Sequence, residues 1–172
     1  MLDNRPFNLY NHSRTAFFTL FECEERPDAA LALLDAGCGW AAGRGLTEIE
    51  GPKGLSVLDG MGLLVRGFEH RPALGIPYNP PYYSRLIEKA GFTVQGETVS
   101  GRIDRSFVLP EKVLLAARAV QERRGLRVQR FRTRADLRSF VPRLRDLYNG
   151  ALEGTTGTYP LGEAEARTMA EQ

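Results

Sequence analysis

The chain has 172 residues, of which 42% are hydrophobic and 26% charged, and its formal net charge is +2. These values are typical of a globular protein with one ordinary domain or two small ones, long enough to bury a sizeable core. Two cysteines, Cys23 and Cys38, are too few for a disulfide framework or a cysteine-based metal site. With no signal peptide and no apolar run of membrane-spanning length, we expect a cytoplasmic protein without a membrane or metal partner.

The first half of the chain predicts a strand, a helix and a second strand. Residues 1–13 are polar and rich in turn-forming residues, which predicts irregular structure. Residues 14–24 predict a strand, because their run from Ala16 to Phe21 is nearly continuously apolar, as in a central strand covered on both faces. Residues 27–44 predict a helix opened by Pro27, and residues 46–51 predict a second strand. Two strands with an intervening helix indicate a βαβ unit with a parallel strand pair. The apolar face of the helix is predicted to comprise Ala30, Leu33, Leu34, Gly37, Cys38 and Ala41.

Residues 78–92 predict a short helix with both ends marked, and we expect the chain to be arranged around it. Asn79 is a favoured N-cap residue, and the two prolines after it fit the first turn, where a missing N–H costs little. Gly91 fits the left-handed position after a helix, and Phe92 can fold back onto the last turn. The long glycine-rich connection before it, residues 52–77, predicts a loop with one structured piece around residues 63–65. The apolar face of the helix is predicted to comprise Tyr83, Leu86, Ile87 and Ala90.

The second half predicts two strand regions among three helices. Residues 93–108 predict a hairpin, and residues 126–132 alternate apolar side chains with arginine, as in a half-buried strand. Residues 110–124 predict a helix opened by proline, with an apolar stripe and a glycine stop. Residues 162–172 predict a last, weakly apolar helix. The stripe of the first of these helices comprises Val113, Leu114, Ala117 and Val120.

Between them lies a longer helix. Thr133 and Asp136 have the spacing of a capping box, and the apolar side chains after them recur with a period of 3.6 residues. Pro142 lies inside this pattern, which predicts a kink or a break. From residue 101 to residue 150 the chain has thirteen Lys and Arg residues against five Asp and Glu residues, so this part is strongly basic.

Four short runs carry a resemblance to a known family: residues 51–52 (GP), 62–68 (GLLVRGF), 78–83 (YNPPYY) and 88–92 (EKAGF). Together they resemble the GNAT superfamily of acyl-CoA N-acyltransferases, in particular bacterial proteins with two successive GNAT domains and mostly unassigned substrates. The resemblance covers most of the chain and implies an α/β fold with a mixed sheet flanked by helices. Residues 1–109 would be the C-terminal part of one such domain, and residues 110–172 the first strand and helices of a second. Alternatively, residues 110–172 complete a permuted single domain.

The resemblance implies transfer of an acyl group from acyl-CoA, with acetyl-CoA as cofactor, to a small-molecule amine. Such a site needs a helix N-terminus for the pyrophosphate, a base for the amine and an acid for the leaving thiolate. In this chain the corresponding strand–helix junction, residues 22–28, has no glycine, and its four acidic residues are opposed only by Arg26. Like charges at close range disfavour a diphosphate there. The cofactor-binding residues therefore stay unassigned.

The candidate site residues are Glu22, Tyr82, Tyr83 and Asn79. Glu22 ends the Phe-rich strand, where related enzymes sometimes place a base; the alternative is a solvated glutamate. The position of the family's usual acid is occupied by Ile87, and Tyr82 and Tyr83 lie one turn earlier, where either could act as the acid or simply pack in the core. Asn79 is a candidate substrate ligand or, alternatively, only a helix cap.

The function predicted is that of a GNAT-like N-acetyltransferase family protein, degenerate or incomplete in this chain. The alternative is a non-catalytic module of acyltransferase fold that binds a ligand or a partner. The arginines between residues 118 and 145 have no aromatic stacking set among them, which argues against nucleic acid. The same helix-rich half could form a homodimer surface.

Overall fold

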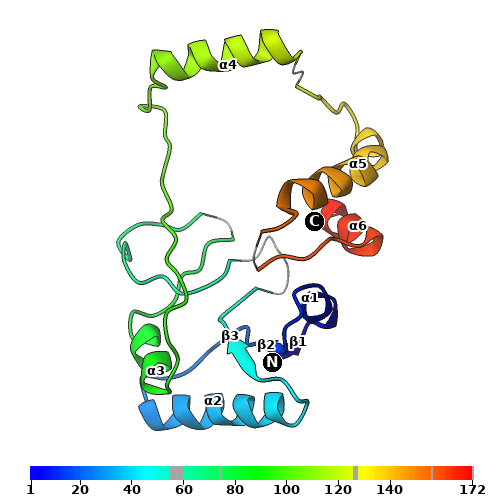
Figure 1. Cartoon of the computed structure of the whole chain (residues 1–172). Helices are drawn as coiled ribbons and strands as arrows, with labels where there is room; N and C mark the ends of the chain where they lie inside the picture. Colours follow the sequence, from blue (N-terminus) through cyan, green and yellow to red (C-terminus); the bar gives the residue numbers. More distant parts are fainter. Residues whose placement is uncertain (55–59, 74, 126–127, 156, 172) are drawn as a thin grey trace. The chain divides into compact units, whose positions relative to one another are not determined.

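The computed structural model describes residues 1–54, 60–73, 75–125, 128–155 and 157–171 (Figure 1). The chain divides into two compact units, which we describe one at a time. Unit 1 comprises Met1–Gln95 and Gly154–Tyr159, and unit 2 comprises Gly96–Glu153 and Pro160–Gln172. Helices and strands are both present, so the protein is α/β, as the sequence predicts.

A three-stranded mixed sheet lies in unit 1. Its strands are β1 (Leu2–Asp3), β2 (Thr15–Phe17) and β3 (Glu48–Glu50), in the order β1-β2-β3. β1 pairs antiparallel with β2, and β2 pairs parallel with β3. Helix α2 (Pro27–Ala42) connects the two parallel strands (Figure 1). The predicted βαβ unit with its parallel pair is confirmed.

The Phe-rich strand is shorter than predicted. β2 ends at Phe17, and although the backbone N–H of Phe18 still donates to Glu50, the chain turns at Leu20, whose φ is +51° and whose side chain is exposed. Phe18 and Phe21 stay buried, in a cluster with residues of α2 and of the helix that follows. Here the apolar run predicts the burial of these side chains correctly but not their secondary structure. Side chains of an irregular segment can also be buried by neighbouring helices.

Residues 1–13 are not irregular, which corrects the prediction. They contain β1 and helix α1 (Arg5–Tyr10). The side chain of Asn4 caps this helix by accepting a bond from the N–H of Phe7, and a proline occupies its first turn. Phe7 is buried and its ring packs edge-on against Phe17 at 5.0 Å. The cap and the proline were readable in the sequence; the contact with Phe17 that stabilises so short a helix was not.

α2 begins at Pro27, as predicted, and ends at Ala42, two residues earlier than expected. Its buried face comprises Ala30, Leu34, Gly37 and Ala41. Leu33 and Cys38, predicted on that face, are exposed instead. The buried stripe is therefore narrower than the sequence indicated.

Helix α3 (Tyr83–Lys89) begins later than the sequence indicated. Its N-cap is Tyr82 without a side-chain cap bond, so Asn79 is not the cap. The predicted core face is confirmed, because Tyr83, Leu86 and Ile87 are buried. After the helix Gly91 has a φ of +92°, and the Phe92 ring packs 5.5 Å from that of Phe18.

The regular elements described in unit 2 are all helices. Helices α4 (Glu111–Arg124), α5 (Arg134–Leu152) and α6 (Glu163–Glu171) agree with the predicted positions. Both halves of the capping box between Thr133 and Asp136 are present, and Gly125 ends α4 in the left-handed conformation. α5 continues through Pro142 as one helix, so the proline does not break it. Packing in this unit buries Val141, Leu161 and Ala166.

The strands predicted after α3 are wrong in the described part of the chain. No strand occurs in residues 93–108, where Val99 is 95% exposed, nor in residues 128–132, while residues 126 and 127 lie outside the described part. A strand requires a partner for its backbone groups, and an alternating sequence alone provides none. Among the described helices, none is long and apolar enough to cross a bilayer.

Candidate functional site

Three of the four predicted site residues meet in one hydrogen-bonded cluster in unit 1. The hydroxyl of Tyr83 donates to Oε2 of Glu22 at 2.9 Å and accepts from the backbone N–H of Cys23 at 3.2 Å. The hydroxyl of Tyr82 donates to the carbonyl of Cys23 at 3.1 Å. We call Glu22, Cys23, Tyr82 and Tyr83 the tyrosine cluster.

Two segments far apart in sequence form this cluster. Glu22 and Cys23 lie between β2 and α2, whereas Tyr82 and Tyr83 begin α3. The Tyr83 ring packs edge-on against Phe21 at 5.0 Å and against Tyr82 at 5.3 Å. Because only 3% of Tyr83 is exposed, its ring is fixed by packing and its hydroxyl by two hydrogen bonds. Such a group is preorganised, as a proton donor at a reactive centre must be.

The environment keeps Tyr83 protonated. Burial raises the pKa of its phenol above the ordinary value, because the phenolate would lose its water. The N–H of Cys23 acts in the opposite direction, and the hydrogen bond to Glu22 and its negative charge raise the pKa further. At neutral pH Tyr83 is therefore a neutral hydrogen-bond donor aimed at a carboxylate. Glu22 itself is exposed.

The rim of the cluster is more acidic than a diphosphate site should be. The N-terminus of α2 has Arg26 as its N-cap residue, without a side-chain cap bond, and Asp28 in its first turn. Arg26 is paired with Asp28 at 2.5 Å, and this hydrogen bond lowers the pKa of the Asp28 carboxyl. Arg85 of α3 is paired in the same way with Glu25. Both arginines thus already have carboxylate partners, so the junction does not fit a pyrophosphate.

Asn79 does not join the cluster through its side chain. Its amide oxygen accepts from the N–H of Leu64 at 2.7 Å, and its amide nitrogen donates to the carbonyls of Leu64 and Pro80. Asn79 therefore fastens the long loop to the segment before α3. This role explains why it is not the helix cap, and its part in substrate binding stays a prediction. Ile87, which the GNAT resemblance aligns with that superfamily's usual acid, is a core residue.

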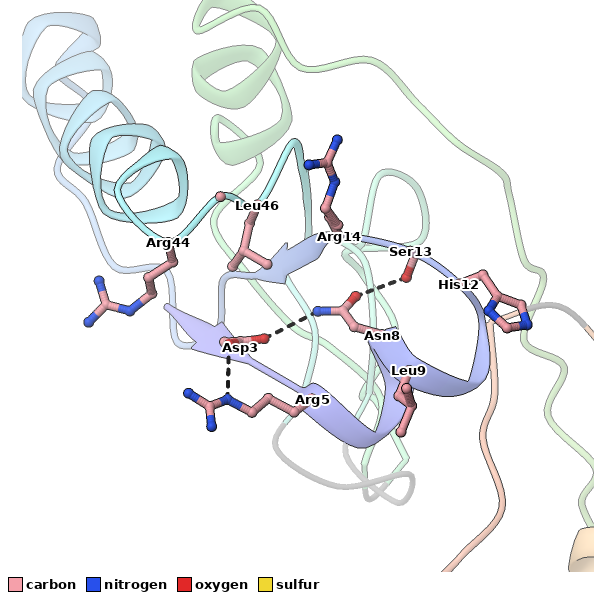
Figure 2. A pocket seen from close by; sticks show the side chains of 10 residues that line it. Asp3, Arg5, Asn8, Leu9, His12, Ser13, Arg14, Arg44 and Leu46 are labelled. Carbon is pink, nitrogen blue, oxygen red and sulfur yellow. Dashed lines mark hydrogen bonds and ion pairs between the residues drawn. The ribbon is translucent and has the colours of Figure 1, made fainter.

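Sequence reasoning missed a shallow hollow of about 490 Å³ beside β1 and α1 (Figure 2). Arginines 5, 14 and 44 are among its lining residues, and the guanidinium groups are spread around the rim in Figure 2 rather than directed at one point. At its centre Asn8 donates to Asp3 at 3.2 Å and accepts from Ser13 at 2.8 Å. Asp3 also pairs with Arg5 at 3.6 Å. These polar groups bind one another, so the hollow is a weaker candidate than the tyrosine cluster.

The described residues contain no group of three or more His, Cys, Asp and Glu side chains that could hold a metal ion. Cys23 and Cys38 are free thiols. The two histidines do not meet: His12 lines the hollow, and His70 lies beside Glu69 in the long loop.

Two curated proteins are similar to this chain over most of its length. The chain is 27% identical over 162 residues to Protein YghO of Escherichia coli (strain K12), an alignment that covers 92% of this chain and 40% of that protein. It is 29% identical over 157 residues to the bacterial ceramide synthase of Caulobacter vibrioides (strain NA1000 / CB15N), covering 90% of this chain and 40% of that protein. No family model and no solved structure matches the chain. The chain thus spans about two-fifths of the length of both relatives and is similar to one named for ceramide synthesis.

Proposed function

We propose that this chain carries part of the site of a GNAT-like N-acyltransferase, which moves an acyl group from acyl-CoA to an amine. The single observation that carries the proposal is the buried Tyr83 hydroxyl, held between Glu22 and the N–H of Cys23. A neutral phenol beside an exposed carboxylate provides the acid and the base that amide formation from a thioester needs. The family resemblance and the name of one relative favour the same reaction.

The proton transfers can be assigned to this chain's residues. In the overall reaction the amine nitrogen forms a bond to the thioester carbonyl carbon and the carbon–sulfur bond breaks, while acyl-CoA supplies the activated acyl group. The Glu22 carboxylate accepts the proton that the amine loses. Tyr83 donates its proton to the leaving sulfur and is reprotonated by Glu22, its hydrogen-bond partner, so both groups return to their starting states. Since the acidic junction does not fit a diphosphate, we assign no residue to the pyrophosphate.

The acceptor that we propose is a long-chain amino alcohol. A ceramide is the amide of such an amine with a fatty acid, and one relative is named for making it. An uncharged amine is needed for attack, so a carboxylate at the site, Glu22, suits an acceptor that arrives as an ammonium ion.

The alternative is a non-catalytic module of the same fold. It is favoured by the junction, where Arg26 and Arg85 are already paired with Asp28 and Glu25. In that case the tyrosine cluster only joins the segment before α2 to α3.

The test is a calorimetric titration of the folded chain with acetyl-CoA and palmitoyl-CoA, followed by an assay of thiol release with a long-chain 2-amino alcohol. The proposal predicts saturable binding and amine-dependent thiol release. Tyr83→Phe is expected to lower kcat by roughly 10²–10⁴-fold, as for removal of a general acid. Tyr78→Phe is the matched control, because its hydroxyl donates to the carbonyl of Phe68 outside the cluster. A folded sample that neither binds acyl-CoA nor releases thiol would overturn the proposal in favour of the non-catalytic module.

A further inference from the structure

Leu20 combines two features that a leucine rarely shows together. Its backbone has a φ of +51°, in the left-handed region, and its side chain is 80% exposed. Among the described residues other than glycine, only His12 also has a positive φ, and histidine occurs there more readily than leucine. In this conformation the Cβ of a leucine comes close to the following carbonyl oxygen, so the backbone is strained. Because so much of the side chain is exposed, packing within the chain offsets little of that strain.

The residues on both sides hold Leu20 in this conformation. Phe18 and Phe21 are buried in the core of unit 1, with their ring centroids 6.2 Å apart. Further along the chain, the backbone N–H of Cys23 donates to the hydroxyl of Tyr83. A strained residue persists where its surroundings fix it, and such residues are found most often at functional sites. Leu20 therefore meets the structural condition for a functional role.

Leu20 lies beside the carboxylate of the tyrosine cluster. It is two residues from Glu22, so their Cα atoms are at most about 7 Å apart. Both residues are exposed, whereas Phe21 between them is buried. An apolar side chain and a carboxylate are thus presented to solvent within the reach of one small amphiphilic molecule.

The charge of the surrounding surface selects a cation. Residues 22–28 and Arg85 together have four carboxylates and two guanidinium groups, a difference of −2. Both guanidinium groups are paired with carboxylates, and the excess charge is that of Glu22 and Glu24, which are exposed. A fatty acid would be repelled by this charge, whereas the ammonium group of an alkylamine would be attracted to it.

We propose that Leu20 is a specificity-determining residue, which contacts the alkyl chain of the amine acceptor while Glu22 faces its ammonium group. The inference rests on the proposed N-acyltransferase function and names the residue that favours a long-chain amine over a short one. An apolar contact with the alkyl chain, away from the reacting nitrogen, stabilises the bound amine and the transition state equally. It should therefore lower KM for long-chain amines without changing kcat.

The experiment compares decylamine with propylamine, which carry the same ammonium group and differ in chain length. Leu20→Asn should weaken decylamine binding to the whole chain, measured by calorimetry, by roughly fivefold to tenfold, because the alkyl chain loses an apolar contact. Propylamine binding should change by less than about twofold, because this amine has little chain to bury. In the thiol-release assay, KM for decylamine should rise in the same proportion with kcat unchanged.

Thermal stability provides a second readout, which a purely structural leucine would move in the opposite direction. Asparagine tolerates the left-handed conformation, so Leu20→Asn should raise Tm by roughly 2–5 °C. Leu20→Met keeps an apolar side chain and should keep the preference for decylamine. Leu9→Asn is the matched control, because Leu9 is also 80% exposed but lies in helix α1. This control should neither raise Tm nor change amine binding.

Three results would overturn the proposal while thiol release by the parent chain leaves the proposed function in place. They are equal affinity of the parent chain for the two amines, an unchanged preference for decylamine in Leu20→Asn, and equal effects of Leu20→Asn and Leu9→Asn. A fall in Tm for Leu20→Asn would also overturn it, because the leucine would then be packed within the chain. A parent chain that binds neither amine and releases no thiol would overturn both proposals.

Discussion

Helices α3 and α4 show how differently the two units use similar sequence signals. α3 has seven residues and buries three of them, Tyr83, Leu86 and Ile87, in the core of unit 1. α4 has fourteen residues, an apolar stripe and a glycine stop, and buries none. The local pattern therefore determines that a helix forms, whereas the presence of a packing partner determines whether its apolar side chains contribute to stability.

The same difference explains which of the predicted strands form. Unit 1 provides two neighbours for β2, and the predicted parallel pair forms. After α3, residues 93–108 and 128–132 have strand-like sequences but form no strand pairing in the described part of the chain. A helix satisfies its backbone hydrogen bonds internally, so a helix can be predicted without knowing its neighbours. A strand needs a neighbouring strand for its backbone hydrogen bonds, so its prediction from a local pattern is less secure.

The largest expected effect on the free energy of unfolding comes from removing a buried leucine side chain, in comparison with an exposed one. Leu86 is 1% exposed, so Leu86→Ala should lower the free energy of unfolding by about 2–5 kcal/mol through lost transfer energy and a cavity. Leu114→Ala in α4 should change it by less than about 0.5 kcal/mol, because the side chain has little packing to lose. Urea unfolding followed by circular dichroism measures both. A comparable loss for the two variants would show that α4 is packed in solution.

The next largest effect on the free energy of unfolding is expected from removal of the Tyr83 hydroxyl. Tyr83→Phe leaves the N–H of Cys23 without its partner and should cost about 1–2 kcal/mol in unfolding free energy. Tyr78→Phe removes a hydroxyl from a tyrosine that is 57% exposed, where water can replace the bond, and should cost less than about 0.5 kcal/mol. Urea midpoints of the two variants against the parent chain test this, and an unchanged midpoint for Tyr83→Phe would mean that the cluster does not stabilise unit 1.

The same tyrosine predicts a pH dependence. Its pKa is raised in the folded state, so above the ordinary tyrosine pKa of about 10 the folded chain binds the proton more tightly than the unfolded chain does. The stability from Tyr83 is thus fully present below about pH 10 and is lost as the pH rises through the folded pKa. Stability measured from pH 8 to 11 should fall less steeply for Tyr83→Phe than for the parent chain. Parallel curves would contradict this.

A smaller effect is expected from the cap of α5. Thr133→Ala removes the side chain that accepts from the N–H of Asp136 and should cost about 1 kcal/mol of helix stability. Thr93→Ala, a surface threonine without a helix to cap, serves as its control. Helix content of unit 2 during thermal unfolding, followed by circular dichroism, is the measurement. If both variants melt alike, α5 is stabilised by its contacts with α6 rather than by its cap.

The smallest effect is expected from Glu22→Gln. Glu22 is exposed, so at neutral pH the unfolding free energy should change by no more than about 0.5 kcal/mol. The substitution removes the negative charge that helps to raise the pKa of Tyr83, so the alkaline loss of stability should become smaller. Glu24 is a nearby exposed glutamate, and Glu24→Gln should leave the loss of stability at alkaline pH unchanged. An identical shift for both glutamates would point to net charge rather than to the Tyr83 contact.

The sequence by itself determined the helices and much of the candidate site. Capping residues, prolines at first turns and the 3.6-residue period placed α2, α4 and α5 because these signals act within a few residues of the chain. It also singled out Glu22, Tyr82 and Tyr83. Only the tertiary structure decided that these three meet, because the contact joins segments about sixty residues apart. It likewise decided that Asn79 fastens a loop and that α4 stays uncovered, because burial and long-range pairing depend on which neighbours the folded chain provides.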